Sequence, residues 1–178
     1  MSLYLIETTL PSEPQRPAMI DQIAEAVVTT GGDLVEIQFG LDAGRLYAIA
    51  EHSSDLAIEA ALRSARVPLH GVVEVRLVGP SLDEVKAARG EAGYLVEWDL
   101  PSGLSMEAYL ARKRANAPGY AQVPETTFLR TYVCEDMSKC LCFYRAPDED
   151  AVLRARRAVN TPVDRVTRIA EAPDRARI

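Results

Sequence analysis

The amino-acid sequence contains an internal repeat. Residues 4–12 (YLIETTLPS) match residues 94–102 (YLVEWDLPS) without a gap, at a separation of 90 residues. A second stretch, from about residue 34 to 75, matches residues that lie 94 positions further along the chain. The difference of four is explained by an extra loop at 118–124, after the first helix of the second copy. A repeat of this length indicates one supersecondary unit that is used twice.

Hydrophobic periodicity and turn signals predict the same order of elements in both halves, namely strand, helix, two strands joined as a hairpin, helix and strand. In the first half we expect strands at 3–9, 34–39, 45–50 and 72–78 and helices at 17–30 and 55–66. In the second half we expect strands at 94–99, 129–134, 139–144 and 165–170 and helices at 105–117 and 148–159. The order βαββαβ is the ferredoxin-like motif.

A single ferredoxin-like unit covers one face of its sheet with helices and leaves the other face bare. An apolar surface of that size needs a partner, and the second copy can supply it. The sequence therefore predicts an α+β protein in which tandem ferredoxin-like βαββαβ domains form a pseudo-dimeric α+β barrel. The first copy is assigned to residues 1–79 and the second to 93–178, and the linker at 80–92 is expected to form a short helix.

Composition excludes several classes of protein. The chain shows no apolar run of the roughly 18 residues that a membrane span needs, and its first residues do not resemble a signal peptide. The net charge of −6 disfavours a nucleic-acid binder. Three clustered cysteines, an odd number, do not suggest a disulfide framework and fit a reducing compartment. We expect a cytoplasmic protein without a membrane or nucleic-acid partner.

Strand alternation sorts polar residues onto the face that the two sheets share. This face is predicted to carry several charged or hydroxyl side chains among apolar ones, which is typical of a small-molecule site. They are Glu7, Glu36, Glu97, Asp99, Arg130 and Tyr132. Carboxylates in such a site could serve as general bases. The alternative is an ion-pair network that holds the halves together, for instance between Glu36 and Arg130, which occupy equivalent positions in the two copies.

The same alternation separates the cysteines. Cys140 and Cys142 lie two residues apart on one strand and are expected to pack under the helices as small core residues. Cys134 points to the opposite face, so it joins the candidate ligand-binding residues Glu7, Glu36, Glu97, Arg130 and Tyr132. The spacing is not that of a zinc site. No base or oxyanion site is identified that would make a catalytic residue of Cys134.

The remaining basic side chains give weaker signals. His52 and His70 flank the second helix of the first copy and are predicted to be exposed to solvent. Arg154, Arg156 and Arg157 lie on the second helix of the other copy, where a basic run usually forms a solvated face.

The second copy resembles a bacterial family of small ferredoxin-like domains that is often labelled nickel-binding protein. The resemblance is carried by YLVE at 94–97, YVCED at 132–136, CFYRAP at 142–147 and PVDRV at 162–166. It covers most of residues 93–171 and extends to the first copy through the repeat. It implies paired ferredoxin-like domains and the binding of a divalent transition metal such as nickel. Nickel favours imidazole and carboxylate ligands, and the second copy contains no histidine.

Three functions are compatible with these observations. The first is a soluble ligand-binding protein that holds a nickel-like transition metal or a small molecule in the cavity between the domains. The second is a cofactor-independent enzyme of the oxygenase or isomerase type, with Glu7 or Glu97 as base and Arg130 as anion anchor. The third is an interaction module without a ligand, for which a closed and ion-paired interior is expected. Bare edge strands favour a homodimer.

Overall fold

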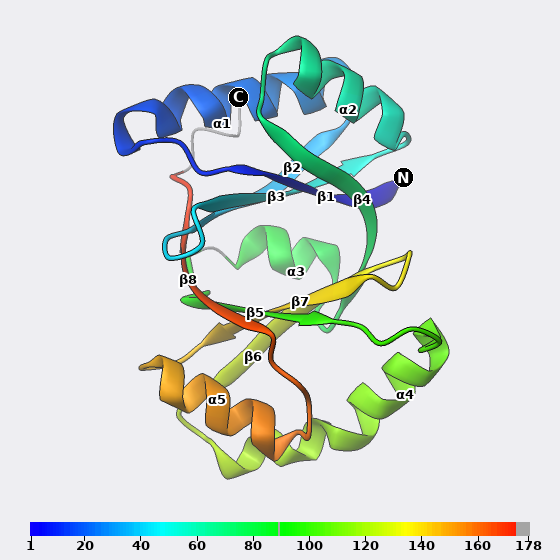
Figure 1. Cartoon of the computed structure of the whole chain (residues 1–178), viewed down its shortest axis with the longest axis vertical. Helices are drawn as coiled ribbons and strands as arrows, with labels where there is room; N and C mark the ends of the chain where they lie inside the picture. Colours follow the sequence, from blue (N-terminus) through cyan, green and yellow to red (C-terminus); the bar gives the residue numbers. More distant parts are fainter. Residues whose placement is uncertain (89, 174–178) are drawn as a thin grey trace.

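The computed structural model describes residues 1–88 and 90–173, and these form two consecutive βαββαβ halves, as predicted (Figure 1). The first half contains β1 (Ser2–Thr9), η1 (Glu13–Gln15), α1 (Arg16–Thr29), β2 (Asp33–Gly40), β3 (Arg45–His52), α2 (Asp55–Ser64) and β4 (Leu69–Val78). The second half contains β5 (Tyr94–Asp99), α4 (Met106–Asn116), η2 (Ala117–Gln122), β6 (Thr127–Cys134), β7 (Lys139–Arg145), α5 (Glu149–Ala158) and β8 (Arg165–Glu171). Between them, α3 (Leu82–Ala87) is the short helix expected for the linker.

Short polar side chains begin several of the helices. The side chains of Ser54, Ser105 and Asp148 each accept a hydrogen bond from the backbone N–H three residues later, at the starts of α2, α4 and α5. Such caps satisfy backbone donors that the first turn leaves free. None of the helices in the described ranges is long and apolar enough to cross a membrane.

The eight strands form a closed barrel in the order β1-β3-β2-β8-β5-β7-β6-β4. Two antiparallel contacts join the halves, β4 with β6 and β2 with β8, and the register places Val75 opposite Cys134 and Gln38 opposite Glu171. The predicted pseudo-dimeric barrel is therefore confirmed. Because every strand of the barrel has a neighbour on both sides, the edge-strand argument for a homodimer does not apply to it.

Buried side chains form three clusters. Helices α1 and α2 cover the outer face of the first half, and α4 and α5 cover that of the second half (Figure 1). The third cluster fills the inside of the barrel, where Leu5, Leu95 and Phe143 meet. Val85 of α3 belongs to this inner cluster, and Lys86 binds Glu51 at the end of β3, so the linker helix closes one end of the barrel.

Candidate functional site

The predicted polar residues of the barrel interior meet one another across the two halves. The Arg130 guanidinium donates to the Glu36 carboxylate from Nε at 2.9 Å and from Nη2 at 2.5 Å. Tyr132 and Gln38 donate to the same carboxylate at 2.5 and 2.9 Å. Both charged residues are buried, with 6% of Glu36 and 5% of Arg130 exposed. The carboxylate of Glu36 is thus fully engaged by protein donors.

A second cluster brings together Glu7 of β1, Glu97 of β5 and Lys139 of β7. The ammonium group of Lys139 binds both Glu7 and Glu97, and Arg165 donates to Glu97 at 3.2 Å. Burial tends to raise the pKa of Glu97, but Lys139 and Arg165 outweigh it, so this pKa lies below its usual value. A carboxylate with a lowered pKa is a weak base. Asp99, expected inside, is exposed at the barrel mouth and pairs with Arg165.

The interior therefore shows the ion-pair alternative that the sequence left open. Glu7, Glu36 and Glu97 face inward as predicted, and each is held by a cation of the second half. A role of these residues in binding a ligand stays a prediction, because a ligand would have to displace protein partners from them.

Cys134 lies on the inner face of the barrel as predicted, whereas His52 does not lie where the sequence analysis placed it. Cys134 is buried in the barrel interior, and burial raises the pKa of its thiol, so the group stays protonated and is a poor nucleophile. The prediction that His52 is exposed is wrong, because only 1% of this residue is accessible. Its Nε2 lies 2.8 Å from the carbonyl oxygen of Thr30, and its Nδ1 accepts from the backbone N–H of Ser54. The α1–β2 connection covers it. His70 is exposed, as expected.

The described residues do not gather a ligand set for nickel. No three side chains of His, Cys, Asp or Glu within 1–88 and 90–173 converge on one point where an ion could be held. The interior carboxylates are already bound by Lys139, Arg130 and Arg165. A positive side chain at each carboxylate opposes a metal cation there.

A pocket with a different character lies in the second half, between the end of β5, α4, η2 and α5. Its lining changes from the exposed Arg112 and Ala117 at the rim to the buried Tyr109 and Arg156 at the base. The complete lining is Trp98, Tyr109, Arg112, Lys113, Asn116, Ala117, Tyr120, Arg156, Val159 and Thr161. Three of these residues are basic and none is acidic. The cavity volume is about 20 Å³, enough for a water-sized group rather than a whole ligand.

Arg156 contradicts the prediction of a solvated basic face on this helix, because only 1% of it is exposed. Its guanidinium donates from Nη1 to the Cys142 sulfur at 3.3 Å and to the Tyr144 hydroxyl at 3.2 Å, and from Nη2 to the carbonyl oxygen of Pro162 at 2.5 Å. Its Nε is buried without a hydrogen-bond partner among the described residues. Arg154 and Arg157 are exposed, as predicted.

The two other cations of the pocket are held by neutral groups. Arg112 donates to the carbonyl oxygen of Asn160 at 2.6 Å and stacks over Trp98, 5.4 Å from the ring centre. Lys113 donates to the Thr131 hydroxyl at 3.0 Å. Within the part of the chain that the structure describes, no carboxylate forms a salt bridge with Arg112, Lys113 or Arg156. The lining of the pocket therefore holds three cations and no carboxylate that pairs with them.

Tyrosine hydroxyls complete the base of the pocket. Those of Tyr120 and Tyr144 are hydrogen-bonded at 2.8 Å. Burial raises the pKa of Tyr120 to about 12, and burial also raises the pKa of Tyr109 and Tyr144. These groups are neutral at pH 7 and add no negative charge.

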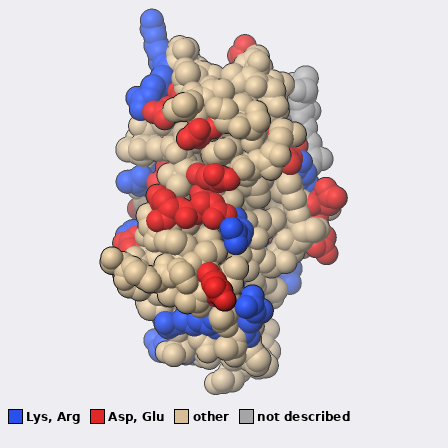
Figure 2. Space-filling model, turned by 90° about the vertical axis from the view of Figure 1, so that its right-hand side faces the viewer, with Lys and Arg blue, Asp and Glu red and all other residues tan. Residues whose placement is uncertain are grey.

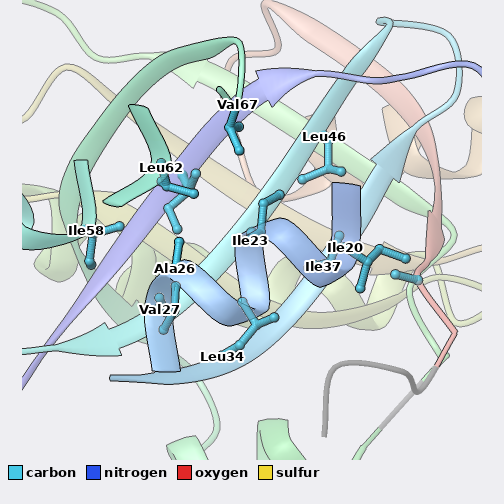
Figure 3. Packing of buried hydrophobic residues seen from close by; sticks show 14 of the residues in the cluster. Ile20, Ile23, Ala26, Val27, Leu34, Ile37, Leu46, Ile58, Leu62 and Val67 are labelled. Carbon is cyan, nitrogen blue, oxygen red and sulfur yellow. The ribbon is translucent and has the colours of Figure 1, made fainter. Parts of the chain in front are cut away.

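The first half of the chain has the same fold without the arginine, cysteine and tyrosine side chains found beneath this pocket. At the separation of 94 residues, Arg156 corresponds to Leu62 and Thr131 to Ile37, and both apolar residues lie in the packed core beneath α1 and α2 (Figure 3). In the same way Cys140, Cys142 and Tyr144 correspond to Leu46, Ala48 and Ala50. The alignment of Arg156 with a core leucine was the sequence signal that could have identified its burial.

Surface charge is divided on the side of the molecule where α4 lies. Figure 2 shows acidic side chains gathered across the middle of this face and a group of basic side chains near its lower end, over the second half. An anion that approaches this end meets a positive surface, although the net charge of the chain is −6.

The fold places the protein in the class of dimeric α+β barrels. Here the two halves of one chain take the place of the two subunits. Residues 94–169 match the family described as nickel responsive protein SCO4226-like, which confirms the resemblance predicted for the second half. The match covers less than half of the chain. No curated protein matches this chain.

Solved structures share the whole fold. A protein described as "Putative Chlorite dismutase TA0507" has a TM-score of 0.60 at 11% identity, over 99% of this chain and 98% of its own. A "putative monooxygenase from Lactobacillus acidophilus NCFM" has a TM-score of 0.55 at 11% identity, over 96% and 94%. An anthrone oxidase-like protein has a TM-score of 0.54 at 10% identity, over 96% and 90%. At these identities the likeness concerns the fold alone.

Proposed function

We propose that this chain is a ligand-binding protein for a small organic carboxylate, whose carboxylate group enters the pocket between α4, η2 and α5. The barrel then acts as a rigid scaffold that holds the second half in place. The proposal keeps the expectation of a small-molecule ligand but moves it from the barrel interior to the outer side of the second sheet. It does not involve a metal ion.

The buried guanidinium of Arg156 is the observation that carries the proposal. Removing one partner from a buried ion pair typically destabilises a protein by about 3–5 kcal/mol, because a charge is left uncompensated. Arg156 has no carboxylate partner in the described chain, and its Nε donor is unused. A carboxylate in the cavity would supply both the charge and the acceptor. The hydrogen bond from Cys140 lowers the pKa of Cys142 well below its usual value, which places a thiolate beside Arg156. Even then the pocket retains two further cations, Arg112 and Lys113.

The shape and chemistry of the pocket limit the ligand. The volume of about 20 Å³ admits one water-sized group, such as a single carboxylate oxygen, so the remainder of the ligand would lie at the rim near Arg112 and Ala117. Trp98, Tyr109 and Tyr120 provide aromatic surface along this path. An aromatic or short aliphatic acid matches these features better than a phosphate, since apolar walls with a few polar groups favour mixed ligands.

Calorimetry and thermal unfolding with benzoate test the proposal, with benzamide as a neutral control of the same shape. We expect benzoate to raise the melting temperature in a concentration-dependent manner and benzamide to have no effect. The effect should be lost in Arg156→Met and retained in Arg157→Met, a matched change at an exposed arginine of the same helix. Lys113→Met is the second test if Arg156→Met does not fold, and it should weaken benzoate binding.

Several outcomes would contradict the proposal. Equal effects of benzoate and benzamide would show that charge is not recognised, and unchanged benzoate binding in Lys113→Met and Arg156→Met would show that the pocket is not the site. Nickel chloride is the third probe, used with protein purified without a metal-affinity column. Binding of nickel without binding of benzoate would favour the metal function that the family name suggests.

A further inference from the structure

We infer that the ligand of this pocket is a dicarboxylate, whose first acid group lies at the base with Arg156 and whose second lies at the rim with Arg112. The inference rests on the proposed function, because it assumes that an organic acid enters the pocket. It narrows the class of ligand from any small carboxylate to one with two acid groups.

One face of α4 runs from the base of the pocket to its rim. Arg112 and Lys113 follow Tyr109 by three and four residues, and all three line the pocket. Side chains at this spacing lie on the same side of a helix. Tyr109 is buried and Arg112 is exposed, and three residues correspond to a rise of about 4.5 Å along the axis. The helix therefore presents a cation about one turn away from the buried base of the pocket.

A single carboxylate at the base would leave the cations of α4 without a negative partner. Arg112 is held by a backbone carbonyl and by the ring of Trp98. Lys113 is held by the Thr131 hydroxyl and lies 4.2 Å from the centre of the Phe128 ring. All four partners are neutral, and in the described parts of the chain neither cation forms a salt bridge.

The guanidinium of Arg112 has donors to spare for a second acid group. An arginine side chain carries five N–H donors. Among the described residues, only Nη2 of Arg112 donates a hydrogen bond, to the backbone after α5. The remaining N–H groups can bind a carboxylate at the rim, where the side chain is exposed and a ligand can reach it.

The first half contains a neutral counterpart of this arrangement. At the separation of 90 residues, Arg112 corresponds to Gln22 and Tyr109 to Met19, and both counterparts line a hollow that has no charged residue in its lining. Gln22 donates to the carbonyl oxygen of Ala65 at the end of α2, much as Arg112 donates to the backbone after α5. Because a neutral amide makes this contact in the first half, the charge of Arg112 is not needed for packing.

Calorimetry with three aromatic acids at low ionic strength tests the inference on the full chain. Isophthalate holds its two carboxylates apart on the ring, phthalate carries the same charge with the groups side by side, and benzoate has one group. We expect isophthalate to bind about fivefold more tightly than benzoate, the effect of one exposed ion pair. Phthalate should show no such advantage, and high salt should reduce that of isophthalate.

A matched pair of variants assigns the effect to the rim. Arg112→Gln introduces the residue that the first half carries at this position, and it should reduce the affinity ratio of isophthalate to benzoate to about one. Arg114→Gln changes an exposed arginine of the same helix that does not line the pocket, and it should keep the ratio of the wild type.

The outcomes separate this inference from the proposed function. Equal affinities of the wild type for isophthalate and benzoate would overturn the inference and leave the carboxylate proposal intact. An advantage shared by phthalate, or retained in Arg112→Gln, would also overturn it, because charge alone would then explain the binding. Failure of all three acids to bind would overturn the proposed function, and the inference with it.

Discussion

Replacing Arg130 by methionine removes the cation that faces Glu36 between the two halves of the barrel. Both side chains are almost completely buried, so the Glu36 carboxylate would remain in the interior with only Tyr132 and Gln38 as donors. Methionine fills much of the volume of the arginine stem, and the loss of packing is small. The change therefore measures mainly the uncompensated charge.

The expected magnitude follows from this burial. Breaking a buried ion pair from one side destabilises a protein by about 3–5 kcal/mol. Because two hydrogen-bond donors remain on Glu36, we expect the lower end, about 3 kcal/mol. For a chain of this size that corresponds to a decrease in melting temperature of about 6–12 °C. The double variant Glu36→Met/Arg130→Met should be more stable than Arg130→Met, because no charge is left buried.

Urea unfolding at pH 7, followed by circular dichroism, measures these differences, and the chain offers a matched control. Arg76 and Glu135 also join the two halves by an ion pair, at 2.8 Å, but on the surface. Arg76→Met should cost less than about 1 kcal/mol. A value for Arg130→Met similar to that of Arg76→Met, or a double variant as unstable as the sum of its single changes, would refute the reasoning.

Three further predictions concern pH, packing and thiol reactivity. The pKa of Glu97 is lowered in the folded chain. Its contribution to stability is therefore complete above the ordinary glutamate pKa of about 4.3 and is lost as the pH falls through the lower folded value. Urea midpoints measured between pH 7 and 3 should fall less steeply for Glu97→Gln than for the wild type. Gly119→Ala should destabilise the chain by about 1–3 kcal/mol, because a Cβ atom there would lie 2.2 Å from the carbonyl oxygen of Ala158. Gly93→Ala is the control and should be nearly neutral in the same unfolding assay, because a Cβ atom at Gly93 has no neighbour within 4 Å. Cys134 should react with iodoacetamide only as fast as the chain opens, since burial raises its pKa, and mass spectrometry showing rapid alkylation in the native protein would contradict this.

The repeat and the period of two in the strands were sufficient to predict the main architecture. They predicted both βαββαβ halves, the inward direction of Glu7, Glu36 and Glu97, and the pairing of Glu36 with Arg130 as an alternative to a ligand site. These predictions succeed because they depend on local patterns. Side chains alternate along a strand whatever lies beside it, and equivalent positions in a repeat meet near the axis that relates the copies.

The functional site depended on contacts that local patterns do not contain. A basic run on a helix usually faces solvent, and only the packing of α4 and η2 against α5 buries Arg156 without a carboxylate partner. Similarly, the strand pattern does not specify that β4 pairs with β6 and β2 with β8, which closes the barrel and removes its free edges. By itself, therefore, the sequence determined the repeated unit and the inner and outer faces of its strands, because these follow from backbone geometry. The tertiary structure decided which charges are compensated and which cavity remains, because both depend on residues distant in the chain that meet only after folding.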